Sequence, residues 1–145
     1  VSNPAVEIEQ LANSSTDEVY NFFRNLKPLA GGKLIVDWLN ANNIPFTILS
    51  APLDGPYQSA CISAKQDWLE ENMPGHGKRA VFDKNKYRYA KSDAHPNLLI
   101  DDYGVNVVAW RKAGGVAIKH EDESETPDAG LLTIASLNEI LISDK

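Results

Sequence analysis

The chain has 145 residues, of which 43% are hydrophobic and 23% charged, which suffices for one sizeable core and is too short for two ordinary domains. Its net charge of -6 argues against a nucleic-acid-binding surface, because neutralising phosphates requires Lys and Arg clusters that outweigh the acids. The lone Cys61 excludes an internal disulfide, and no apolar run approaches the ~20 residues that span a bilayer. No secretory leader pattern is found. We therefore expect a cytoplasmic protein with a small-molecule partner and without nucleic acid or membrane contacts.

The first part of the chain predicts three helices. Polar Asn and Ser residues separate a short helix over residues 5–12 from a second over residues 16–25. Asp17 and Glu18 stand in the first turn of the second helix, where they favour the positive end of the helix dipole. After a break rich in Pro and Gly, apolar residues recur at helical spacing and predict an amphipathic helix over residues 33–42.

Short apolar runs alternate with helical patterns through the remainder of the chain. The runs predict strands over residues 44–49, 80–82, 98–100 and 116–118. The helical patterns predict helices over residues 58–73, 105–113 and 136–142. This alternation indicates an α/β fold with a mainly parallel sheet, and the acidic stretch at residues 121–128 is typical of a solvated loop.

Polar residues directly follow two of the predicted strands. Ser50 ends the first apolar run, and Asp101 and Asp102 end the third. Ligands of open α/β sheets bind at the carboxyl ends of strands, so these residues are candidates for a site. Two adjacent carboxylates leaving a buried strand repel each other unless a cation lies opposite, and Mg²⁺ prefers such oxygen ligands. Residues 78–91 also hold six of the fourteen Lys and Arg residues, a local positive field that attracts a phosphate monoester.

Three motifs of this sequence resemble those of haloacid-dehalogenase-type phosphatases, and they follow one another along the chain in the order that the family has. The string LLIDD at residues 98–102, followed by Asn106, looks like the fourth motif of that family, and FTILSAP at residues 46–52 looks like the second. Lys91 lies ten residues before the first of these aspartates, a spacing similar to that of the third-motif lysine in the branch of 5'(3')-deoxyribonucleotidases and related phage-type proteins. The likeness runs from about residue 22 to residue 120. Each motif is common by itself, and their combination in order is fairly specific.

The resemblance implies a fold and an activity. The fold would be a Rossmann-like three-layer sandwich, with residues 1–30 forming part of a small helical cap and residues 31–145 forming the α/β core as one globular unit. The activity would be magnesium-dependent hydrolysis of a small phosphate monoester, with a nucleoside monophosphate as the favoured substrate.

The resemblance also implies roles for the matching residues. Asp101 and Asp102 would hold or orient Mg²⁺. Ser50 and Ala51 would bind the phosphate, and Lys91 would neutralise its charge. These four side chains and the one backbone group make up the expected site.

One family motif has no counterpart in this sequence. The family's first motif, an apolar strand that runs into Asp-x-Asp-Gly, carries the nucleophile and the central strand of the sheet. Nothing before Phe22 resembles it, and Asp17 stands at a polar helix start instead. We therefore expect the chain as printed to be inactive, with its first core strand missing or replaced, either by residues 6–8, by a strand from another chain, or by a different closure of the sheet.

Two other functions stay open on the sequence alone. One is a non-catalytic module that binds Mg²⁺ and phosphate, and the other is an interaction protein that completes its sheet with a strand from a partner or a second copy. Plainer interpretations exist for the single residues as well: Asp101 and Asp102 as a helix N-cap, Ser50 as a turn residue and Cys61 as a core thiol. The three histidines show no metal-ligand spacing.

Overall fold

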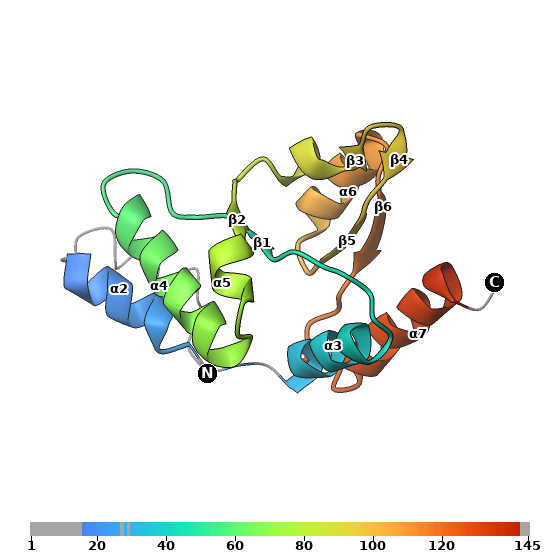
Figure 1. The fold of residues 1–145 in the computed structure, drawn as a ribbon, viewed down its shortest axis with the longest axis horizontal. Coiled ribbons are helices and arrows are strands. Elements are labelled where there is room, and N and C mark those ends of the chain that lie inside the picture. The colour runs from blue at the N-terminus through green and yellow to red at the C-terminus, as the bar shows by residue number, and fades with distance from the viewer. Residues whose placement is uncertain (1–15, 27, 29, 143–145) are drawn as a thin grey trace. The chain divides into compact units, whose positions relative to one another are not determined.

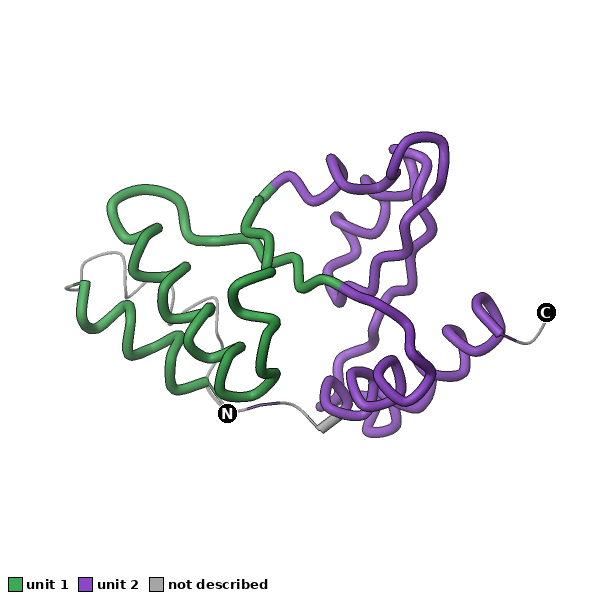
Figure 2. Tube along the Cα trace, viewed as in Figure 1, with its two compact units in different colours: residues 1–27, 47–84 green, residues 28–46, 85–145 purple. Residues whose placement is uncertain are grey.

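The computed structural model describes residues 16–26, 28 and 30–142, and the chain forms two compact units (Figure 2). Unit 1 takes residues up to 27 together with residues 47–84, and unit 2 takes residues 28–46 together with residues 85–145. The helix predicted over residues 5–12 and the replacement strand considered at residues 6–8 lie outside the described residues. The division expected from the family resemblance, into a cap segment over residues 1–30 and an α/β core over residues 31–145, stays a prediction.

Unit 1 is built around a helix pair. Its elements are α2 (Thr16–Arg24), β1 (Leu49–Ser50), α4 (Gln58–Asn72), α5 (His76–Arg79) and β2 (Val81–Phe82) (Figure 1). Val19 and Phe23 lie one turn apart on α2, so both face α4 and pack on its small buried residues Ala60, Cys61 and Ala64. β1 and β2 pair in parallel, with Ser50 opposite Phe82.

Unit 2 holds the longer parallel pair. Its elements are α3 (Ala30–Ala41), η1 (Lys86–Tyr89), β3 (Lys91–Ser92), β4 (His95–Pro96), β5 (Leu98–Asp101), α6 (Gly104–Lys112), β6 (Val116–Lys119) and α7 (Ala129–Leu141) (Figure 1). β3 and β4 form an antiparallel hairpin, and β5 and β6 run parallel with Asp101 opposite Lys119. The carboxyl ends of β5 and β6 therefore meet at one edge.

The β5–β6 pair lies between helices on both faces. Ile100 and Ile118 belong to the core that contains residues of α3 and α7. Strand residues alternate in direction, so Leu99 and Ala117 turn to the opposite face, where α6 packs with Val107 and Trp110 buried. Unit 2 is thus a small helix–sheet–helix stack.

The mixed α/β class is confirmed, with parallel pairing in two of the three two-stranded sheets of the described chain. The strand predicted over residues 44–49 is wrong for most of its length, because only Leu49 and Ser50 are in β1; Pro45 has no N–H to donate to a ladder. The helix predicted over residues 136–142 begins earlier, at Ala129. No helix in the described part of the chain is long and apolar enough to cross a bilayer.

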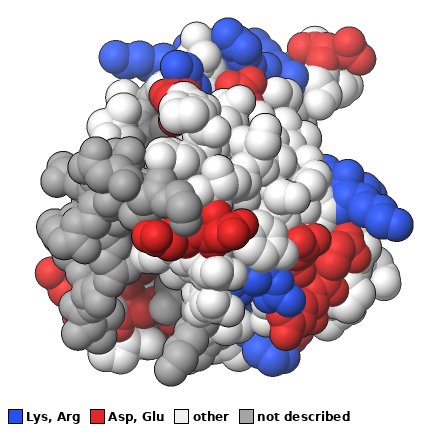
Figure 3. All heavy atoms as spheres, turned by 90° about the vertical axis from the view of Figure 1, so that its left-hand side faces the viewer, with Lys and Arg blue, Asp and Glu red and all other residues white. Residues whose placement is uncertain are grey.

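Charged side chains of both signs lie close together on the surface, as the face drawn in Figure 3 shows. Arg24 pairs with Glu71 in unit 1, and Lys33 pairs with Asp37 one turn away on α3 in unit 2. Water screens such exposed pairs, so they add little to stability. The stability of the fold rests on the apolar contacts and on the buried polar groups described below.

Helices α3 and α7 approach each other at two glycines. A Cβ atom added to Gly130 would lie 2.7 Å from the Cα atom of Gly31, a distance that real side chains do not adopt against backbone. A Cβ atom added to Gly32, the next residue on α3, would meet nothing within 4 Å. The close approach therefore depends on Gly130 and not on glycine content as such.

We expect Gly130→Ala to lower the free energy of unfolding by about 1–3 kcal/mol, because the methyl group forces the two helices apart. Gly32→Ala is the matched control and should raise it by about 0.5–1 kcal/mol, since alanine is the better helix former and the site has room. Urea denaturation followed by circular dichroism measures both. Equal effects of the two substitutions would contradict the proposed helix contact.

Candidate functional site

The carboxylate of Asp101 is the most buried charged group of the described chain, with 4% of its side chain exposed. It ends β5 and receives three hydrogen bonds. Tyr103 N–H donates at 3.0 Å, Lys86 Nζ at 2.9 Å and Asn106 Nδ2 at 3.0 Å. A buried carboxylate is tolerated when its oxygens are satisfied in this way.

The two adjacent acids are shifted in opposite directions. Burial raises the pKa of Asp101, but the hydrogen bonds from Tyr103, Lys86 and Asn106 and the charge of Lys86 outweigh it, so its pKa lies below its ordinary 3.8. Burial raises the pKa of Asp102 above 3.8, and the hydrogen bond and negative charge of Asp101 raise it further. Two carboxylates this close favour a cation between them.

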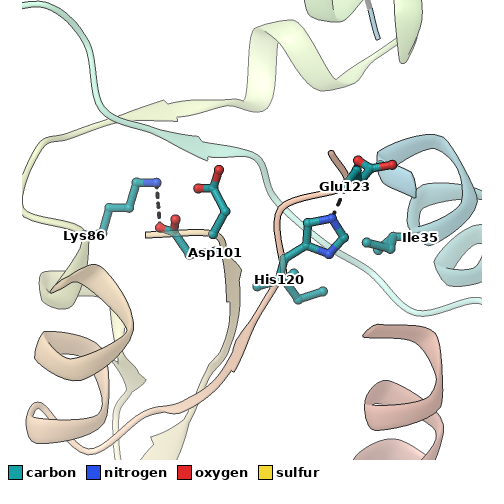
Figure 4. Close-up of a pocket in the computed structure, with 8 residues that line it drawn as sticks. Ile35, Lys86, Asp101, His120 and Glu123 are labelled. Atoms are coloured by element: carbon teal, nitrogen blue, oxygen red, sulfur yellow. Dashed lines mark hydrogen bonds and ion pairs between the residues drawn. The ribbon is translucent and has the colours of Figure 1, made fainter. Parts of the chain in front are cut away.

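These acids line a hollow of about 310 Å³ in unit 2. Its polar lining consists of Lys86, Asp101, Asp102, His120 and Glu123. In Figure 4 the amine of Lys86 points at the carboxylate of Asp101, and His120 and Glu123 face each other elsewhere in the same hollow. The hollow therefore combines an acid pair, one ammonium group and one imidazole–carboxylate pair.

Asp101 and Asp102 are the residues that fit a divalent cation. Mg²⁺ commonly takes one or two carboxylates and completes its shell with water and phosphate oxygens. Among the residues that the structure describes, no group of three or more His, Cys, Asp or Glu side chains is arranged to hold a metal, so a transition-metal cage is not formed there. Lys86 already donates to Asp101 Oδ2, and a bound Mg²⁺ would compete with its ammonium group for that oxygen.

Lys86 and His120 are residues of the hollow that the sequence patterns do not predict. Lys86 is one of six basic residues in a run, and His120 has no second His or Cys near it in sequence. His120 carries a signal nonetheless, since it directly follows the apolar strand β6 just as Asp101 ends β5. The strand-end rule that selected Asp101 also applies to His120.

Ser50 lies in unit 1, at the end of β1, and has a lysine partner that the sequence analysis missed. Lys65 on α4 donates to Ser50 Oγ at 2.8 Å and to the carbonyl oxygen of Ala51 at 2.9 Å. The Lys65 ammonium also lies 5.3 Å from the ring centroid of Phe23, a cation–π distance. Because Ser50 accepts from Lys65, its own O–H can donate to an anion, and the pair is suited to bind phosphate oxygens.

Lys91 does not line the hollow that contains Asp101. It is exposed on β3, and its aliphatic stem packs on the turn at Gly114, where an added Cβ atom would collide with Lys91 Cε. The lysine beside Asp101 is Lys86, five residues earlier. Within unit 2 the structure thus brings together Asp101 and Asp102 of the expected residues, adds Asn106 as a partner of Asp101, and leaves Lys91 apart from them.

No family model, curated protein or solved structure matches this chain. The family resemblance seen in the sequence motifs therefore stays a proposal, and the site has to be judged by its own geometry.

We expect Lys86→Met to lower the free energy of unfolding by about 3 kcal/mol at neutral pH, because it leaves a buried carboxylate without its charged partner. The folded-state pKa of Asp101 lies below 3.8, so the ionised carboxylate stabilises the fold above that pH, and this contribution is lost as the pH falls through the folded-state value. The difference between wild type and variant should therefore shrink in acid.

Lys84→Met is the control, since Lys84 pairs with Asp54 at 3.6 Å while both side chains are more than half exposed. Denaturant titrations at neutral and acidic pH measure the two variants. A loss for Lys86→Met that does not change with pH would mean that the ammonium charge is not what stabilises Asp101.

Proposed function

We propose that this chain is a haloacid-dehalogenase-type, magnesium-dependent phosphate monoester hydrolase domain, with a nucleoside monophosphate as the favoured substrate. The observation that carries the proposal is the acid pair at the end of β5, where Asp101 is buried, ionised and held by three donors while Asp102 stands beside it with a raised pKa. An arrangement of this kind at strand ends is suited to hold a cation next to a phosphate.

Each group has a role in the proposal. Mg²⁺ bound by Asp101 and Asp102 would stabilise the charge on the phosphoryl oxygens. Lys86 and Asn106 orient Asp101 through their hydrogen bonds. In unit 1, Ser50 and Lys65 supply an O–H and N–H donors of the kind that bind phosphate oxygens.

The printed sequence holds no Asp-x-Asp pair, and the family reaction needs one for nucleophile and general acid. We therefore expect this chain to bind its ligand without turning it over. The same feature supports the second candidate, a non-catalytic module that binds Mg²⁺ and phosphate. The third candidate, an interaction protein, is supported by the two-stranded sheets, whose outer edges can accept a strand from a partner or a second copy.

We expect saturable, Mg²⁺-dependent binding of a nucleoside monophosphate by the wild-type chain, and at least a tenfold loss of affinity in Asp101→Asn, because the acid pair then carries one charge fewer. Isothermal titration with and without EDTA measures the binding, and phosphate release is assayed in the same samples. Asp93→Asn is the matched control, since Asp93 is exposed and has a left-handed φ of 55° that Asn adopts readily.

Three outcomes bear on the candidates. Binding without phosphate release supports the Mg²⁺ and phosphate site that the proposal, for the chain as printed, shares with the non-catalytic module. Magnesium-dependent turnover that Asp101→Asn abolishes would refute the claim that the nucleophile is missing. No binding of Mg²⁺ or nucleotide, together with a concentration-dependent dimer, would favour the interaction protein instead.

The phosphate role of unit 1 has its own test. We expect Lys65→Met to weaken binding of inorganic phosphate at least about tenfold in the presence of Mg²⁺, because a charged donor beside Ser50 is lost. Lys33→Met is the control, since Lys33 is exposed on α3 and pairs only one turn away with Asp37. An unchanged phosphate affinity in Lys65→Met, with the fold intact by circular dichroism, would refute phosphate binding by Ser50 and Lys65 of unit 1.

A further inference from the structure

The imidazole–carboxylate pair of His120 and Glu123 is the part of the hollow that the proposed function does not use. His120 directly follows β6, and its main-chain N–H donates to the carbonyl oxygen of Asp101 at 2.9 Å. The two residues are therefore neighbours at the same strand ends. His120 and Glu123 line the hollow together with Asp101 and Asp102.

The His120 ring is held in one orientation by a buried hydroxyl. Its Nδ1 atom lies 2.8 Å from Thr133 Oγ1, and Thr133 on α7 is only 3% exposed. The Nε2 atom faces Glu123 Oε2 at 3.7 Å (Figure 4). A bare Nε2 lone pair would repel that carboxylate, so the neutral ring carries its proton on Nε2 and accepts the Thr133 hydroxyl at Nδ1.

Glu123 has one satisfied and one unsatisfied carboxylate oxygen. Oε1 accepts the N–H of Gly31 at 2.7 Å, at the start of α3. Oε2 is buried and has no hydrogen-bond partner, because the 3.7 Å that separates it from His120 Nε2 is too long for one. A buried acceptor left in this state costs about 1–3 kcal/mol, so a group that donates to it would be bound favourably.

We propose that the gap between His120 Nε2 and Glu123 Oε2 binds a hydroxyl group of the ligand whose phosphate is held at the acid pair. A hydroxyl is the group that fits, since it accepts from Nε2–H and donates to Oε2 at the same time. The inference rests on the proposed function and adds to it the means by which monoesters of hydroxyl-bearing, sugar-type alcohols, nucleoside monophosphates among them, are recognised. His120 and Glu123 are then the residues that select them.

Access to the gap follows from the same distances. Only 15% of the His120 side chain and 18% of the Glu123 side chain are exposed, so an entering hydroxyl has to move them apart. No hydrogen bond joins Nε2 to Oε2, so only the anchors of the two groups, Thr133 at Nδ1 and Gly31 at Oε1, resist their separation. The adjoining wall at Gly32 is open, because a Cβ atom there would meet nothing within 4 Å.

The test compares two esters that differ in their hydroxyl groups. Ribose 5-phosphate and n-pentyl phosphate are titrated calorimetrically into the full chain with saturating Mg²⁺, beside inorganic phosphate. We expect wild type to prefer ribose 5-phosphate over pentyl phosphate by about tenfold to a hundredfold, the range for hydrogen bonds that involve a charged group. His120→Gln and Glu123→Gln should each reduce the preference to less than about threefold.

Glu123→Gln separates recognition from structure. Its carbonyl oxygen still accepts the Gly31 N–H, while an amide NH₂ replaces the unsatisfied oxygen, so the fold should be kept. Thr133→Val should lower the preference for ribose 5-phosphate partially, because the His120 ring stays but loses the hydroxyl that holds its orientation. His95→Asn, on the exposed strand β4, is the control and should not change this preference. If Glu123→Gln lowers the unfolding midpoint, His120→Gln provides the second, independent variant.

The outcomes distinguish this inference from the proposed function. If wild type binds none of the three phosphates, the proposed function fails and this inference falls with it. If wild type binds both esters equally, or if the Gln variants keep the preference for ribose 5-phosphate, the acid pair stands as a phosphate site and the hydroxyl site is refuted.

Discussion

Unit 2 depends on one buried carboxylate. Asp101 ends β5, and its oxygens take hydrogen bonds from the turn at Tyr103, from Asn106 on α6 and from Lys86 on η1. The same group thus fixes the strand end, the helix that follows and the short helix before it. Because a charge can stay buried only while its partners remain, the fold around the site and the chemistry of the site are maintained by the same contacts.

This coupling explains which features the sequence predicts well. The apolar run that ends in acids predicts the strand β5 with Asp101 at its end, since strand, burial and polar end are all local properties of residues 98–102. Lys86 and Lys91 are a different case. Lys86 lies beside Asp101 because it stands on the 3₁₀ turn η1, and Lys91 lies apart from Asp101 because it stands on the β3–β4 hairpin. Both elements are too short to have a sequence periodicity from which they could be predicted.

Contacts across the fold were also beyond prediction. Lys65 on α4 is fifteen residues from Ser50 in sequence, and only the tertiary fold of unit 1 brings the two together. The early start of α7 is not predicted from the sequence because Gly130 and Thr133 are poor helix formers. In the structure both residues lie on the buried face of α7, together with Ala129 and Leu137. In each case tertiary packing decided what local propensity left open.

The division into two units has a consequence for how the chain can be assembled and cut. Each unit is made of two separate stretches of sequence, so the chain leaves unit 2 after residue 46 and comes back at residue 85. Unit 2 therefore cannot close during synthesis until the whole intervening segment has been made. The entropic penalty of closing unit 2 across this inserted segment grows only by about 0.6 kcal/mol for each doubling of the segment's length. A change in the length of residues 47–84 therefore has little effect on the stability of unit 2. A single truncation after residue 84 keeps both stretches of unit 1 but carries residues 28–46 along as an excursion, whereas rejoining the chain across residues 46 and 85 would isolate unit 2 as one continuous polypeptide.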